Sequence, residues 1–492
     1  MSNNIKSMRK LNKATMLSAI ICSMYINNAL AEEPIVTLNK AVEIAILTNP
    51  EILQSYKTYE AAVKDTDAAF GRYLPSVDLI ASTGAEDRRD PLVANNTMGT
   101  KYQRSQATLS LKQMIFDGFA TKNEIARLDK TSKAKLYELE NTSQNVALEA
   151  TKAYVDLLRY RSLVSQTEDN YVAHKIIYEQ LQLKAQAGVG KKSDVEQARS
   201  RLSLADYNMT VEGSNLHDIE ARYQRLMGSL PPKQINVAVP VDKDIPQTAI
   251  EAVKYAQLNS PLLLATIEDI QSQEALVNFK TSAFAPKVDF RARSETGSDL
   301  NGYSGSYKND VAEIVVSWNL FNGGTDLNLR KKEFNLLEAA KERRDRTCRD
   351  IRLELEIAFN DIKKLTEQVN YLDARQISIE KARDAYRKQF EIGQRTLVDL
   401  LNSENEVFES KRLYTNAVSD LSIARARTHH KMGTLLSTLG LARLASAEAS
   451  LPATSSLDGA NIAACSADVP TRYLPNREEL DSRANEGLSI KR

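Results

Sequence analysis

The chain has 492 residues, of which 42% are hydrophobic and 26% charged, and its formal net charge is +1. This length suffices for two or three domains with a large core, and the near-zero charge excludes a protein that coats nucleic acid through a basic excess. Glycine (18) and proline (13) are scarce for this length, so long uninterrupted helices are possible. Four histidines and three cysteines leave little material for a metal or thiol enzyme, so no metal site, cofactor or enzymatic activity is expected.

The N-terminus has the pattern of a secretory signal peptide. Four basic residues precede an apolar stretch over 14–26 that is too short to span a bilayer, and the sequence Ala-Leu-Ala at 29–31 is an A-x-A cleavage site. We therefore expect a signal peptide at 1–31, cleavage before Glu32 and an exported protein. No other run of about 18 apolar residues follows, so no transmembrane helix is expected in the mature chain.

The remainder of the chain contains an internal duplication. The segment from 37 to 50 aligns with 248–261, and the segment from 188 to 194 aligns with 393–399 at a slightly shorter offset. The shortening falls in a glycine-containing stretch, where a loop tolerates deletion. The expected segments are a first repeat at 32–230, a linker at 231–247, a second repeat at 248–440 and a tail at 441–492.

Each repeat is expected to open with a short helix, at about 37–71 and 248–283, and to continue with a β-hairpin. Apolar residues such as Val77, Leu79 and Ala81 alternate with polar neighbours. Alternation over about ten residues predicts a transmembrane strand with one face toward lipid, although a half-buried soluble strand carries the same pattern. The four expected strands lie at about 76–84, 104–116, 287–296 and 311–321.

Two segments without glycine or proline, at 119–187 and 325–392, predict very long helices. A helix of nearly 70 residues is roughly 100 Å long at 1.5 Å per residue. Apolar residues recur at steps of three and four from Leu355 to Leu372, which is coiled-coil periodicity. We therefore expect these helices to pack side by side as long arms.

Glycine-containing turns at 188–192 and 393–395 are expected to end both long helices, because glycine supplies the positive φ that a helix needs to stop. Ser193 and Thr396 are the candidate N-caps of the returning helices. The returning helices are expected at 193–227 and 396–432.

The C-terminal tail at 441–492 is rich in alanine and serine and then in charge, which predicts poor order. The mature chain keeps two cysteines, Cys348 and Cys465. An oxidising compartment permits a disulfide between them, and nothing in their spacing requires one.

These elements together predict an oligomer. Four strands cannot close a barrel, and an open sheet edge is not tolerated in lipid. The expected fold is an α-helical coiled-coil barrel that continues a transmembrane β-barrel, built from two tandem repeats of helix, β-hairpin and long helical hairpin. Such an assembly conducts and does not catalyse.

The two turns carry a resemblance to a known family. The run from Phe390 to Asn402, Phe-Glu-Ile-Gly-Gln-Arg-Thr-Leu-Val-Asp-Leu-Leu-Asn, resembles the tip motif of the TolC family of outer-membrane channel-tunnels, and the run from Gly188 to Arg199 resembles its first-repeat counterpart. The resemblance covers about 37–440. It implies a homotrimer with a twelve-stranded barrel in outer-membrane lipid and a twelve-helix periplasmic barrel. It also implies docking onto a periplasmic adaptor, or membrane fusion protein, and an inner-membrane ABC or RND-type transporter, with no nucleic-acid partner.

Three features resemble the type I protein-secretion branch of this family. The tip reads Gly-x-Arg-Thr-Leu-Val-Asp, a polar tail follows the second repeat, and Cys22 follows an isoleucine where a lipid-attachment site has a small residue. We therefore expect a passive duct for exported proteins. Multidrug or small-molecule efflux through the same fold is the first alternative, and a periplasmic coiled-coil adaptor or structural protein is the second.

The resemblance also assigns residues to a gate at the periplasmic end, where polar links hold the tip helices together in the family. Asp194, Arg395 and Asp399 match the family pattern, and Ser193 keeps the hydroxyl of a threonine. Arg395 and Asp399 are four residues apart, so one helix can pair them.

Two positions depart from the family gate, and the turns themselves imply a docking surface. Phe390 stands in place of a tyrosine and Asn402 in place of an aspartate, which removes a hydroxyl and a charge. The residues implied in adaptor docking are Gly188, Val189, Gly190, Gly393, Gln394 and Thr396.

Overall fold

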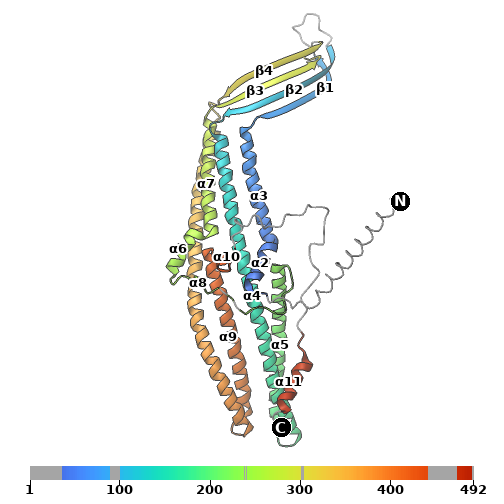
Figure 1. Ribbon diagram of the computed structural model, residues 1–492, viewed down its shortest axis with the longest axis vertical. Helices are drawn as coiled ribbons and strands as arrows, with labels where there is room; N and C mark the ends of the chain where they lie inside the picture. The colour runs from blue at the N-terminus through green and yellow to red at the C-terminus, as the bar shows by residue number, and fades with distance from the viewer. Residues whose placement is uncertain are drawn as a thin grey trace, which may run out of the picture.

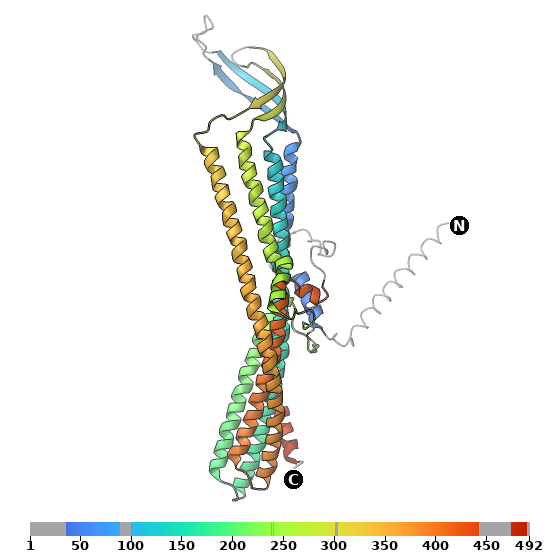
Figure 2. The same ribbon diagram turned by 90° about the vertical axis from the view of Figure 1, so that its left-hand side faces the viewer.

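The computed structural model describes residues 36–88, 100–237, 239, 241–300, 304–441 and 474–489. These residues form a long rod of helices with a four-stranded sheet at one end (Figures 1 and 2). The expected signal peptide lies outside the described residues. Cys465 lies outside them too, so a disulfide between it and the half-buried Cys348 stays a hypothesis.

The same order of elements recurs in both halves of the described chain: two short helices, two strands, a helix of 67 residues and a returning helix of 36 residues. The first half contains α2 (Leu38–Thr48), α3 (Pro50–Phe70), β1 (Ser76–Arg88), β2 (Thr100–Phe116), α4 (Ala120–Gln186) and α5 (Lys192–Met227). The second half contains α6 (Ala249–Asn259), α7 (Pro261–Thr281), β3 (Lys287–Ser298), β4 (Ser306–Ser317), α8 (Thr325–Glu391) and α9 (Leu397–Met432). Helices α10 (Leu435–Thr438) and α11 (Arg477–Ser489) follow.

The opening segment of each half is two helices, where one was expected. Pro50 has no N–H to continue α2, and it takes the first position of α3 instead. The Asn49 side chain caps the new helix, because its oxygen accepts the Glu51 backbone N–H at 2.9 Å. A serine and a proline make the same break between α6 and α7.

The strands form one antiparallel sheet in the order β1-β2-β3-β4, so the pairing of β2 with β3 joins the two halves. The observed strands β1, β2 and β3 are longer than expected. Strand β4 lies earlier than expected and ends at Ser317, because Trp318 donates its indole N–H to the Phe284 carbonyl at 3.1 Å and the chain leaves the sheet there. Strands β1 and β4 form the two edges of the sheet.

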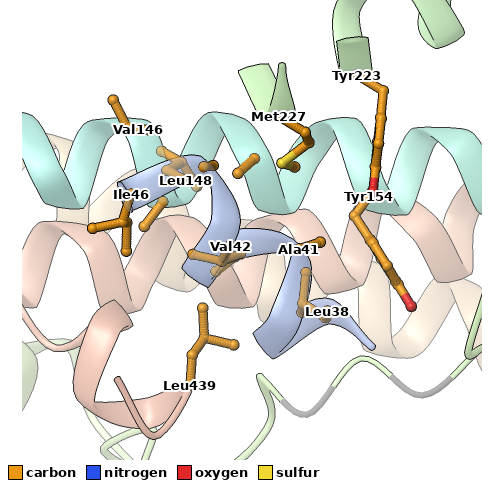
Figure 3. Packing of buried hydrophobic residues seen from close by; sticks show 14 of the residues in the cluster. Leu38, Ala41, Val42, Ile46, Val146, Leu148, Tyr154, Tyr223, Met227 and Leu439 are labelled. Carbon is orange, nitrogen blue, oxygen red and sulfur yellow. The ribbon is translucent and has the colours of Figure 1, made fainter. Parts of the chain in front are cut away.

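The main hydrophobic core lies around the middle of α4, where α2 and the end of α5 pack against it (Figure 3). Leu38 and Val42 from α2 and Leu157 from α4 are completely buried. The buried Tyr154 hydroxyl donates to the carbonyls of Val36 and Asn236, at 2.9 and 2.7 Å, and so holds both flanking segments against α4. This cluster packs α2 and the end of α5 against α4 at the middle of the rod. The two ends of α4 lie outside the cluster and make other contacts.

The tail prediction was wrong in one part. We expected poor order over 441–492, but α11 packs against α4, and Leu480 and Ala484 are buried there. The reason is local: these two residues are four apart and form a narrow apolar face that composition alone does not reveal. Within the described residues, no helix has the length and apolarity to cross a membrane.

Candidate functional site

Most of the apolar side chains of the sheet lie on one of its two faces, although Ile80 and Val315 lie on the other. Residues paired between neighbouring strands point to the same face, and the register pairs Leu79 with Leu109, Leu111 with Ala292 and Phe290 with Ile314. The predicted alternation is therefore confirmed as one continuous apolar face. Its residues are Val77, Leu79, Ala81, Ala107, Leu109, Leu111, Val288, Phe290, Ala292, Ala312, Ile314 and Val316.

Nothing among the described residues covers this apolar face. Leu79 is 71% exposed and Ile314 is 67% exposed, whereas an ordinary half-buried strand would hide such side chains under a helix or a second sheet. Lys308 and Asp310 also lie on this face, toward the loop end, and pair with each other at 3.1 Å. The uncovered apolar area is what a lipid-facing sheet presents.

The opposite face carries charged and polar side chains that pair across strands. Lys112 on β2 and Arg291 on β3 both contact the Asp289 carboxylate, at 3.4 and 3.2 Å, and Arg104 contacts Glu86 at 3.4 Å. Such a face is suited to a water-filled interior.

At the other end of the rod, glycine turns reverse both long helices as expected. Gly188 has φ 76° and Gly393 has φ 79°, which are left-handed values that residues with a Cβ rarely adopt. The Gln394 N–H then donates to the Gln389 carbonyl at 2.8 Å, and the Val189 N–H donates to the Lys184 carbonyl at 3.0 Å. These bonds end each long helix, and the turns that follow lie at the solvent-exposed end of the rod.

Thr396 is confirmed as an N-cap, and it forms a reciprocal capping box with Asp399. The Thr396 hydroxyl oxygen accepts the Asp399 backbone N–H at 3.2 Å, and the Asp399 carboxylate accepts the Thr396 backbone N–H at 3.3 Å and the Thr396 hydroxyl at 2.9 Å. Hydrogen bonds from Thr396, together with the charge of Arg395, lower the pKa of Asp399. Asp399 is thus ionised and fixed in position at the start of α9.

Arg395 is held mainly within its own hairpin. Its guanidinium lies 4.3 Å from the ring centroid of Tyr386, its Nε donates to Gln389 at 3.0 Å, and it reaches Asp399 at 3.8 Å. The expected pairing of Arg395 with Asp399 is confirmed at 3.8 Å, and the stacking on Tyr386 and the hydrogen bond to Gln389 hold the same guanidinium.

Ser193 is not the N-cap of α5. The helix begins one residue earlier, at Lys192, and its N-cap Lys191 makes no side-chain capping bond. The Ser193 hydroxyl instead donates to the neighbouring Asp194 at 3.2 Å. Among the described residues, no hydrogen bond or ion pair joins Ser193 or Asp194 to the second turn.

The two tips nevertheless share one apolar cluster. Val195 at the start of α5 and Leu397 at the start of α9 are buried in it, and Phe390 packs against it. The Lys184 ammonium lies 5.7 Å from the Phe390 ring centroid. The Phe390 ring therefore serves as an apolar and cation–π contact at the tip.

Polar contacts between the two hairpins follow α9 away from the tip, and sequence reasoning missed them. Arg201 on α5 donates to Asn402 at 3.1 Å, and His174 on α4 lies 3.1 Å from Asn405. Asn402, which we predict to depart from the family gate, thus has a defined partner on the other hairpin. The sequence gives no sign of these pairs, because their members lie about 200 or more positions apart.

Between these contacts, Glu404 ties α9 to α8. Its side chain is only 3% exposed and accepts hydrogen bonds from Arg383, at 3.1 Å, and from Arg387. Two guanidiniums thus compensate the burial of this carboxylate. One segment of α9, from 402 to 405, therefore contacts α4, α5 and α8.

The family model for outer membrane efflux proteins matches residues 41–229 and 252–433, more than half of the chain. The chain belongs to the outer membrane efflux protein family. Members of this family are outer-membrane channels and not enzymes, so the channel interpretation is confirmed over the adaptor alternative, and the protein is placed in the outer membrane.

Curated relatives agree with this family. The chain is 24% identical over 378 residues to the outer membrane efflux protein BepC of Brucella suis, covering 74% of this chain and 78% of the relative. It is 24% identical over 417 residues to the outer membrane protein TolC of Escherichia coli, covering 81% and 82%. It is 22% identical over 413 residues to the alkaline protease secretion protein AprF of Pseudomonas aeruginosa, covering 78% and 83%.

Solved structures support the same fold. The outer-membrane channel OprN superimposes with a TM-score of 0.71 at 18% identity, covering 81% of this chain and 90% of that one. The CmeC outer membrane channel of Campylobacter jejuni superimposes with a TM-score of 0.69, also at 18% identity, covering 81% and 86%. At this level of identity the likeness concerns the fold alone.

Proposed function

We propose that this chain is the passive outer-membrane duct of a tripartite export machine and that its cargo is protein, by type I secretion. The main observation in support of a duct is the uncovered apolar face of the sheet, which is joined to helices far longer than a globular core requires. The name of the relative AprF, a protease secretion protein, supports protein cargo. The name of the relative BepC, an efflux protein, favours the alternative of small-molecule cargo.

We further propose a homotrimer with a twelve-stranded barrel. Edge strands β1 and β4 have unpaired sides within the protomer, and lipid does not tolerate such edges, so β1 of one protomer would pair with β4 of the next. Exposed apolar residues on α8 support helix contacts between protomers: Leu353, Ile357 and Tyr371 are 56%, 50% and 75% exposed.

The partners in this proposal are a periplasmic adaptor and an inner-membrane ABC or RND-type transporter. The adaptor would dock at the exposed turns, where Val189 is 79% exposed, and the transporter would supply energy that the duct lacks. Loss of secretion on substitution of Val189 by aspartate, with normal trimer assembly, would support this surface.

The proposed gate consists of Asp194, Arg395 and Asp399, with Ser193 beside them. Charge reversal of Arg395 or Asp399 should raise the conductance of the resting channel in a planar bilayer. Because Asp399 also caps α9, Thr396→Ala is the matched control, since it removes the cap without changing a charge. Unchanged conductance in both reversals would contradict the gate assignment.

A deletion strain separates the two cargo classes. Type I secretion predicts the loss of specific proteins from the culture medium and unchanged susceptibility to antibiotics and dyes. Small-molecule efflux predicts the reverse pattern. Complementation with the full chain should restore whichever property was lost.

A further inference from the structure

The C-terminal helix α11 occupies a groove between α4 and α5 near the tips, beside the lower part of both helices (Figure 1). Leu480, at 3% exposure, packs against Tyr171 of α4 and Ala205 and Met209 of α5, and Ala484, one turn further along α11, is completely buried. These contacts form a small, complete helix-docking site.

Ion pairs hold α11 in this groove. At its start, Arg477 pairs with Asp206 of α5 and lies 5.6 Å from the Tyr171 ring centroid. Further along, Arg483 pairs with Asp169 of α4 at 2.6 Å.

The middle of α11 carries a third polar contact. Its Asp481 accepts a hydrogen bond from the Tyr171 hydroxyl at 3.3 Å and lies 3.6 Å from the Lys175 ammonium. Arg477 and Arg483 of α11 thus face carboxylates, and Asp481 between them faces the Lys175 ammonium, so the charges of α11 match those of the surface beneath it.

The helix depends on the groove for its own stability. It has 13 residues, and an isolated helix shorter than roughly 12–15 residues is marginal in water. Its sequence also includes serine, asparagine and glycine, which are weak helix formers. Helix formation and docking are therefore one event, and release of α11 would unfold it.

The docked helix α11 contacts the same helical turns of α4 and α5 that also contact α9. On α4, Tyr171 and Lys175 face α11, whereas His174, between them in sequence, faces Asn405 of α9. On α5, Ala205 faces α11, and Arg201, one turn earlier, donates to Asn402 of α9. The α4–α5 pair is thus held from two sides at one level of the rod.

We propose that the groove of Tyr171, Ala205 and Met209 is a docking site for the chain's own α11, and that α11 is a releasable clasp on the tip. Docked, it holds α4 and α5 in the position that permits their polar contacts with α9. Released, it weakens those contacts and favours opening of the tip. The effect on opening rests on the proposed channel function, whereas the docking does not.

The first test measures docking by hydrogen exchange of the full-length protein in detergent. Leu480→Asp places a charge in the apolar groove, and loss of a buried leucine corresponds to about 10- to 100-fold faster exchange in the 477–489 segment. Ser482→Asp adds the same charge at an exposed position of the same helix and should leave exchange unchanged.

A charge-reversal pair tests the contact between Arg483 and Asp169. Arg483→Glu should speed exchange, and Asp169→Arg in the same protein should restore protection, more clearly at low salt than at high salt. A wild-type segment that exchanges as fast as in Leu480→Asp would overturn the docking site.

The second test measures the resting conductance of the same variants in planar bilayers. Leu480→Asp should raise it several-fold relative to both the wild type and Ser482→Asp. Unchanged conductance in Leu480→Asp, together with raised conductance in Arg201→Ala, would overturn the clasp and leave the channel intact. Failure of every variant to conduct would overturn the proposed function and the effect of α11 on opening, while exchange would still decide the docking.

Discussion

Replacing Glu404 with glutamine should loosen the tip end of the α8–α9 hairpin. The buried carboxylate accepts hydrogen bonds from Arg383 and Arg387, and a hydrogen bond to a charged group contributes about 1.5–3 kcal/mol. The two arginine side chains are 21% and 37% exposed, so water would solvate them in part once the charge is removed. We therefore discount the sum of the two hydrogen bonds by about half and expect a loss of about 1.5–3 kcal/mol.

Hydrogen exchange of the amides around residues 400–410 measures this loss directly, because these amides exchange through local opening of α9. A loss of about 1.5–3 kcal/mol corresponds to roughly 10- to 150-fold faster exchange. The matched control is Glu406→Gln, which removes the same charge from an exposed position two residues away. Adding Arg387→Ala to Glu404→Gln should cost less than Arg387→Ala costs alone, because the partner is already gone.

The reasoning would be refuted if Glu404→Gln and Glu406→Gln exchanged alike. It would also be refuted if the effects of Glu404→Gln and Arg387→Ala were additive. Either result would mean that apolar packing, rather than the buried charge, holds α9 to α8.

Three further predictions follow from the described contacts. Asn402→Asp places a charged oxygen beside Arg201, so the resting conductance should fall roughly two- to fivefold in planar bilayers, as expected for an exposed ion pair, and a rise would contradict the contact. Leu109→Arg on the apolar sheet face should reduce recovery of folded protein in the outer membrane, since an arginine facing lipid costs about 2–4 kcal/mol at the midplane. Thr108→Arg, on the polar face of the same strand, should leave that recovery unchanged. Burial lowers the pKa of His430 to about 3, so below pH 6.5 the unfolded chain binds a proton that the native chain does not. The free energy of unfolding should fall as pH decreases through this window, by up to about 1.4 kcal/mol per unit, and His430→Gln should reduce that slope in denaturant titrations.

The sequence predicted best those features that depend on local chemistry. Runs without glycine or proline gave the bounds of α4 and α8 to within one residue, and Thr396 caps α9 as its spacing to Asp399 suggests. Alternation predicted the apolar sheet face, because the side-chain period of a strand is fixed by its geometry. The bounds of β4 were wrong because Trp318, whose apolar character extends the alternation, bonds to a turn instead.

Contacts between segments that are far apart in the sequence could not be predicted from local patterns. Nothing local to Asn402 indicates Arg201, and the capping role of Ser193 failed because the helix starts one residue earlier. The sequence did not predict the docking of α11, because this polar segment contains only a few apolar residues. Its composition is therefore the same as that of a disordered tail. The residues that hold α11 in place belong to α4 and α5, so the sequence of the tail alone could not reveal them.

The native mass of the particle extracted by detergent from purified outer membranes tests the central claim most directly. The duct requires closed strand pairing between protomers, so the account predicts a single species of three chains in the outer-membrane fraction. A soluble periplasmic monomer would mean that the apolar sheet face does not contact lipid. It would contradict the barrel, the gate and the duct together.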